Sequence, residues 1–140
     1  MFKKSTEDLM QSLRSNAHLR AVLAQEGEFV AQPLHEALGA LLREKGLTRA
    51  QVIQGSMLNT IYGHQIFAGT KTPSRDKLLA IAFGMRLTFE EVDTLLKQQG
   101  YPRLYPRLER DAVLIWGFMH RLPLLDVNTL LYENGLDTLV

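Results

Sequence analysis

Residues 47–69 read LTRAQVIQGSMLNTIYGHQIFAG, and this stretch decides the fold that the 140-residue sequence predicts. Thr48 is a favourable N-cap for a short helix that ends near Ser56. Asn59 is a favourable N-cap for a second helix, and Gly69 is a favourable residue to terminate it. The stretch therefore predicts two short helices joined by a tight turn.

The remainder of the sequence also predicts helices. Apolar residues recur at helical spacing, whereas no stretch clearly alternates apolar and polar residues and no Asn-Gly or Asp-Gly hairpin turn occurs. Pro102 and Pro106 exclude a continuous helix, so we expect an extended, packed connector over 101–107. The expected fold class is all-α. Further helices are expected from Ser5 or Thr6 through Leu13, Asn16 to Gly27, Pro33 to Gly46, Ser74 to Phe83, Thr88 to Gly100, Leu108 to His120 and Leu124 to Asn134.

The composition is ordinary for a soluble globular protein, with 46% hydrophobic and 22% charged residues. Its apolar runs are shorter than the about 20 residues that a membrane span needs. The N-terminus turns acidic at Glu7 and Asp8, which is unlike a signal peptide. The absence of cysteine excludes disulfides and cysteine-ligated zinc and fits a reducing compartment. We therefore expect a cytoplasmic protein that does not associate with membranes.

Positive charge is concentrated in the middle of the chain, although the net charge is only +1. Both flanks, 1–42 and 78–140, carry a slight excess of acidic residues. Such a distribution indicates a central segment suited to an anionic partner. Between residues 43 and 77 the basic residues are Arg43, Lys45, Arg49, Lys71, Arg75 and Lys77, against the acidic residues Glu44 and Asp76.

Residues 75–101 match residues 110–136 at an offset of 35. The matches include arginine, aspartate, threonine and glycine as well as leucine. Two helical hairpins that converged on similar patterns would explain the similarity. A duplicated helix-loop-helix unit, whose second copy packs beside the first and extends its core, would explain it too. The identical pairs are Arg75/Arg110, Asp76/Asp111, Leu79/Leu114, Phe83/Phe118, Arg86/Arg121, Leu87/Leu122, Val92/Val127, Thr94/Thr129, Leu95/Leu130, Leu96/Leu131 and Gly100/Gly135.

The second copy carries more bulk and less charge than the first. This difference predicts a surface that packs on something, either the core of the same chain or a protein partner. Trp116, Met119, Leu124 and Leu125 stand where the first copy has Ile81, Gly84, Phe89 and Glu90.

The two-helix stretch and the residues around it resemble the phage-repressor-type (Cro/CI-like, xenobiotic-response-element) family of helix-turn-helix regulators. The resemblance covers about residues 34–96 and implies a five-helix, phage-repressor-like domain over 33–100. An N-terminal helical arm (1–32) and a connector with an additional helical hairpin (101–140) would flank that domain. The residues that carry the resemblance are Leu47-Thr48, Val52, Ile66, Gly69, Lys71, Pro73-Ser74, Leu78-Leu79, Ile81-Ala82, Leu87-Thr88 and Glu90-Glu91.

The resemblance implies a sequence-specific transcriptional regulator that binds double-stranded DNA as a homodimer. Its second helix, about 59–67, would lie in the major groove. By position, Arg49, Ser56 and Lys71 would contact DNA phosphates. The residues that would contact bases are Asn59, Thr60, His64 and Gln65.

The sequence departs from the family pattern in three places, and it also has a glycine inside the second helix. Met57 occupies a turn position that usually holds a small residue, often glycine. Ile53 replaces the usual alanine of the first helix and would separate the two helices or shift their packing. Gly63 lowers the intrinsic stability of the second helix and allows close approach to the first helix or to DNA. The segment 59–67 contains no lysine or arginine, so little phosphate neutralisation comes from it.

An enzyme is not expected, because no convergent set of catalytic residues is visible. The sequence has no glycine-rich phosphate loop, no nucleophile elbow and no metal-ligand spacing, so neither a cofactor nor a metal is expected. A protein-interaction module on the same fold, such as an antitoxin, an adaptor or a phage-encoded inhibitor, is the alternative function. The C-terminal hairpin would then contact the partner. The scattered histidines are His18, His35, His64 and His120.

Overall fold

The computed structural model describes residues 5–15, 19, 22 and 32–140. Every regular element within these residues is an α-helix, so the all-α prediction is confirmed. The helix expected from Asn16 to Gly27 lies largely outside the described residues. The helices are α1 (Thr6–Ser15), α3 (Leu34–Lys45), α4 (Arg49–Gly55), α5 (Thr60–Ala68), α6 (Arg75–Gly84), α7 (Phe89–Gln98), α8 (Glu109–Met119) and α9 (Leu124–Glu133).

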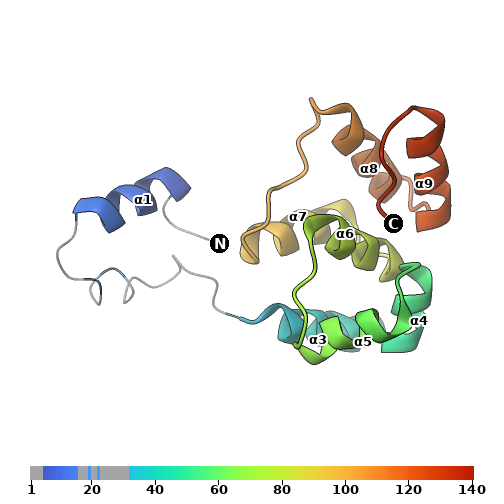
Figure 1. Cartoon of the computed structure of the whole chain (residues 1–140), viewed down its shortest axis with the longest axis horizontal. Coiled ribbons are helices and arrows are strands. Elements are labelled where there is room, and N and C mark those ends of the chain that lie inside the picture. The colour runs from blue at the N-terminus through green and yellow to red at the C-terminus, as the bar shows by residue number, and fades with distance from the viewer. Residues whose placement is uncertain (1–4, 16–18, 20–21, 23–31) are drawn as a thin grey trace.

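The helices from α3 onward pack around one core. Helices α3, α4 and α5 lie together on one side, α6 and α7 occupy the middle, and α8 and α9 lie on the other side (Figure 1). The buried apolar residues of all three groups form one continuous cluster. The segment 101–140 therefore extends the core of the preceding helices. Within the described residues, no helix has the length and apolar character that crossing a bilayer requires.

Local capping determines where most of these helices begin. The side chains of Thr48, Ser74 and Thr88 each accept a hydrogen bond from a backbone amide in the first turn of the following helix, as the sequence predicts. Thr48 and Thr88 form complete capping boxes with the residues three positions later. Pro33 is the N-cap of α3, so this helix begins one residue after the start that the sequence predicts.

The repeated residues build matching elements in the structure. Helix α9 begins and ends 35 residues after α7, and Arg86 and Arg121 both have a positive φ. The two hairpins pack against each other through contacts of α6 with α9 and of α7 with α8. The rings of Phe83 and Phe118, which are equivalent residues, stack with their centroids 3.8 Å apart.

Reciprocal ion pairs hold the two hairpins together. Arg75 donates hydrogen bonds to both carboxylate oxygens of Asp111, and Arg110 donates to both carboxylate oxygens of Asp76. The arginine of each hairpin thus contacts the equivalent aspartate of the other hairpin. This reciprocal arrangement is typical of an interface with two-fold symmetry. The structure therefore places an internal pseudo-two-fold axis between α6–α7 and α8–α9.

The segments that follow the hairpins are equivalent as well. Arg75 also donates to the carbonyls of residues 102 and 103, and Arg110 donates to the carbonyls of residues 137 and 138. Leu104 and Leu139 are both buried at the next matching position. The connector predicted to be extended and packed is therefore held by an arginine, and its counterpart at the C-terminal end is held in the same way.

Candidate nucleic-acid interface

The turn between α4 and α5 contains a residue in an unfavourable backbone conformation. Met57 has a φ of 56°, in the left-handed region, and its side chain is exposed. This conformation costs a residue with a Cβ about 1–2 kcal/mol, whereas glycine adopts it freely. The structure thus explains why a glycine suits this turn.

Ile53 and Gly63, both unusual in the sequence, are partners in the structure. Ile53 is buried in α4, and a Cβ built on Gly63 would lie 2.8 Å from two of its side-chain carbons. The missing side chain of Gly63 leaves the volume that Ile53 fills. Gly63 therefore allows close approach to the first helix, and the bulk of Ile53 is accommodated.

Helix α5 presents a mixed polar and apolar face to solvent. Asn59, Thr60 and His64 are exposed, as their predicted roles require, whereas Gln65 is half-buried. Ile61 is 71% exposed. Sequence reasoning missed Ile61 as a surface residue, although its spacing of three from His64 and four from Gln65 places all three on one helix face.

Two of the predicted base-contacting residues also serve the local structure. The side-chain oxygen of Asn59 accepts a hydrogen bond of 3.1 Å from the Tyr62 amide and so caps α5. Its amide nitrogen still has two hydrogens to donate. The carbonyl of Gln65 accepts from the amides of Thr70 and Lys71, which ties the loop after Gly69 to the end of α5.

Two exposed cations lie near the last turns of α5. Arg49 lies over the ring of Phe67, with its guanidinium carbon 6.0 Å from the ring centroid, and this contact positions the first turn of α4 against α5. Lys71 is exposed in the loop that the Gln65 carbonyl holds. A third cation, Lys77, lies 5.8 Å from the ring centroid of Tyr62 and was not predicted as a contact residue.

Part of the positive charge of the central segment is neutralised by other regions of the chain. Lys45 forms an ion pair of 2.8 Å with Glu91, and Arg75 is paired with Asp111. Burial alone would raise the pKa of Glu91, but hydrogen bonds from Lys45 and Thr88 outweigh it and hold that pKa below its usual value. The charge available to an anionic partner is therefore smaller than the sequence count suggests.

The prediction that Ser56 contacts a phosphate is wrong. Its side chain is 0% exposed, and its hydroxyl donates a hydrogen bond of 2.6 Å to the carbonyl of Val52. A Cβ built on Gly84 of α6 would collide with Ser56. Ser56 thus belongs to the close contact between α4 and α6.

The described residues contain no cluster of three or more histidine, aspartate or glutamate side chains that could hold a metal ion. No protein-family model matches the chain, and neither a curated protein nor a solved structure gives a match.

Proposed function

We propose that the chain is a sequence-specific regulator that binds double-stranded DNA through a phage-repressor-type helix-turn-helix. In this proposal residues 33–100 form the DNA-binding domain, and α5 lies in the major groove. The observation that carries the proposal is the exposed face of Asn59, Thr60, Ile61 and His64 on a short helix that follows a tight turn. An exposed helix face of this size fits the major groove.

The side chains on this face offer distinct kinds of base contact. The Asn59 amide suits an adenine edge, and His64 can donate or accept a hydrogen bond at a base edge. Thr60 and Ile61 offer methyl groups to thymine. The face therefore favours A·T-rich half-sites, and Ile61 supplies an apolar contact that does not depend on salt.

Arg49 and Lys71 support the proposal as phosphate contacts. Both are exposed, and both are held close to α5, one by the Phe67 ring and the other by the loop bonded to Gln65. Because α5 contributes no lysine or arginine, we expect weak binding by a single domain. Two chains on a two-fold operator would compensate, so we propose a homodimer on DNA.

Selection from a random duplex library, followed by fluorescence anisotropy at several salt concentrations, tests this function. Arg49→Ala and Lys71→Ala should each weaken binding to all sequences and reduce the salt slope by about one. Ile61→Ala should instead change the preferred sequence. Arg107→Ala, which removes an exposed cation of the connector, is the matched control. Binding that is absent, or unaffected by both cation variants, contradicts the proposal.

A specific observation favours protein binding as a second candidate function. Four apolar residues of α8 and α9 are more than half exposed, and the ring of Trp116 stacks on His120 at 3.8 Å. Exposed apolar surface with Trp and Tyr side chains is typical of protein–protein interaction sites, as an adaptor, antitoxin or inhibitor would need. The residues are Trp116, Met119, Leu125 and Tyr132.

Co-purification distinguishes this candidate from DNA binding. A stoichiometric protein partner that is lost on Trp116→Ala, with no nucleic acid retained, would favour the interaction module. Unchanged duplex binding by Trp116→Ala, with no protein partner in the purified material, would exclude it.

A further inference from the structure

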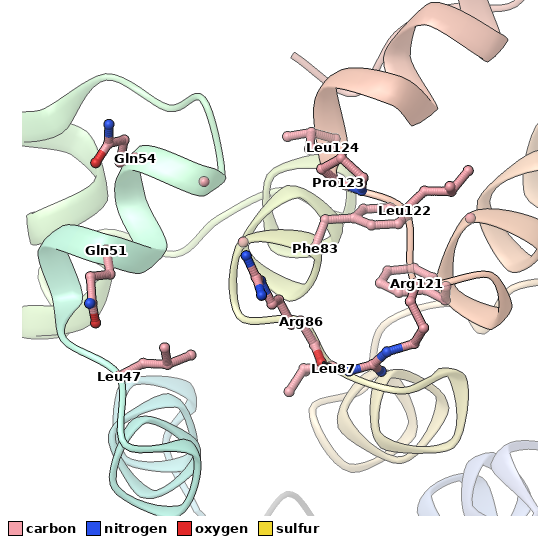
Figure 2. Close-up of a pocket in the computed structure, with 14 residues that line it drawn as sticks. Leu47, Gln51, Gln54, Phe83, Arg86, Leu87, Arg121, Leu122, Pro123 and Leu124 are labelled. Atoms are coloured by element: carbon pink, nitrogen blue, oxygen red, sulfur yellow. Dashed lines mark hydrogen bonds between the residues drawn. The ribbon is translucent and has the colours of Figure 1, made fainter.

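A cavity of about 790 Å³ opens between α4, the C-terminal end of α6 and the turn that joins α8 to α9 (Figure 2). This volume lies within the range of small-molecule sites in proteins. Leu47, Gln51 and Gln54 line the side of α4, and Phe83 and Leu87 line the side of α6 and the residues after it. The cavity thus lies between the two-helix unit and the C-terminal hairpin.

The charged residues that line the cavity are both arginines. Arg86 and Arg121 are exposed at equivalent positions of the two hairpins, and none of the described residues that line the cavity carries a carboxylate. The Arg121 guanidinium donates a hydrogen bond of 3.0 Å to the carbonyl of Arg86. The Arg86 guanidinium makes no hydrogen bond or ion pair with the described residues, and Figure 2 shows it reaching toward the side of α4.

The backbone at both arginines is in a conformation that favours glycine. Arg86 has a φ of 56° and Arg121 a φ of 58°, whereas the other positive φ values in the described chain belong to four glycines and to Met57. An arginine in this region costs about 1–2 kcal/mol relative to glycine. Backbone strain of this kind is concentrated at functional sites, and here both strained arginines line the cavity.

We propose that this cavity binds a small organic anion, with a carboxylate or phosphate on Arg86 and Arg121 and an apolar body against Phe83 and Leu122. Guanidinium groups match the geometry of both kinds of anion. The side-chain amides of Gln51 and Gln54 lie on the opposite wall, where they can bond polar atoms at the far end of the ligand.

Occupancy of the cavity regulates DNA binding, and this part rests on the proposed function. Helix α4 forms one wall, and it contacts α6 closely at Gly55, where an added Cβ would lie 3.2 Å from the Gly84 Cα. A ligand that bridges α4 and the hairpin stabilises the position of α4. Ile53 of α4 packs on Gly63 of α5, so a change in the position or mobility of α4 is transmitted to α5. Ligand binding therefore alters the position or the mobility of the exposed face of α5.

Calorimetric titration of the full chain without DNA tests the site. The probes are phenylacetate, phenyl phosphate, inorganic phosphate and benzyl alcohol. We expect phenylacetate or phenyl phosphate to bind at least tenfold more tightly than inorganic phosphate or benzyl alcohol, and the stronger of the two identifies the anionic group. Failure of both organic anions to bind overturns the proposal, as does equal binding by inorganic phosphate.

The variant Arg86→Gly separates binding from folding. Removal of the Cβ relieves the positive φ, so the melting temperature without ligand should rise while affinity for the probe falls at least tenfold. Arg107→Gln, an exposed arginine outside the cavity, should leave both unchanged. Probe binding that survives Arg86→Gly overturns the site. Probe binding that leaves DNA affinity unchanged overturns only the regulatory role, and absence of DNA binding contradicts the proposed function alone.

Discussion

The hairpins α6–α7 and α8–α9 share a backbone arrangement and differ in what covers them. Helix α4 packs on α6, in which Ile81 is 0% exposed, whereas Trp116 at the equivalent position of α8 is 55% exposed. Glycine at position 84 admits the close approach of α4, and Met119 replaces it in the second copy. The residues common to both copies thus build the hairpin, and the residues that differ decide what can dock on it.

The outer faces of α7 and α9 differ in the same sense. Glu90 and Lys97 of α7 correspond to Leu125 and Tyr132 of α9, which are more than half exposed. In the first hairpin, α7 therefore carries charged residues on its outer face, and α6 is covered by α4. In the second hairpin, α9 carries apolar residues on its outer face, and Trp116 and Met119 of α8 are exposed.

The largest effect is expected at the pair Gly84 and Met119. Gly84→Ala should lower the free energy of unfolding by about 3 kcal/mol, because its new Cβ would lie against the backbone of Val52 and Ser56, which cannot move aside easily. Met119→Ala, at the equivalent exposed position, should change it by less than about 0.5 kcal/mol. Urea unfolding followed by circular dichroism measures both. Equal losses of unfolding free energy in the two variants would contradict the proposed difference in packing between α6 and α8.

A smaller effect is expected from the two ion pairs that relate the hairpins. The side chain of Asp111 is 6% exposed and also accepts a hydrogen bond from the Tyr105 amide, whereas the side chain of Asp76 is 40% exposed. Asp111→Asn should cost about 2 kcal/mol, because a buried charged network loses its anion. Asp76→Asn should cost about 0.5 kcal/mol, because solvent screens that pair. Chemical denaturation would contradict the asymmetry if Asp76→Asn were the more costly change.

The start of α7 should be more sensitive than the start of α9. Thr88→Ala removes the capping box of α7 and should cost about 1 kcal/mol, with faster hydrogen exchange at the Glu91 amide. Thr88→Ser retains the hydroxyl and serves as the control. Helix α9 begins after Pro123 without a side-chain cap, so its first-turn exchange should not respond to either variant. Exchange that rises equally in both helices would indicate global destabilisation instead of the loss of a cap.

The smallest effect is a pH dependence at Glu91. The pKa of Glu91 is lowered in the folded chain, so its contribution to stability is present above the unfolded value of 4.5 and is lost as the pH falls through the folded value. Glu91→Gln should therefore cost about 0.5 kcal/mol near neutral pH and less in acid. Thermal unfolding across this pH range measures the difference. A loss of stability in Glu91→Gln that becomes larger at acid pH would contradict a lowered pKa of Glu91 in the folded chain.

Asp126→Asn, at the equivalent position of α9, is the matched control for Glu91→Gln. Its side chain makes no hydrogen bond or ion pair with the described residues. A pH-dependent cost as large as that of Glu91→Gln would mean that the comparison between the two hairpins does not extend to their first turns.

The sequence by itself determined the features that depend on neighbouring residues. The helix starts at Thr48, Asn59 and Thr88 are confirmed because a cap acts on amides within the next turn. Glycine at position 69 ends α5 because the left-handed conformation is local to that residue. The match between the two hairpins was visible as well, because equivalent residues recur at one offset.

Only the tertiary structure decided which of these residues remain available to a partner. Ser56 is buried because α6 packs against it, and Arg75 is neutralised by Asp111, which is 36 residues away in the sequence. Ile61 is exposed because the contacts of α5 with α3 and α4 leave it uncovered. Packing between distant segments determines exposure and charge pairing, and local propensity carries no information about it.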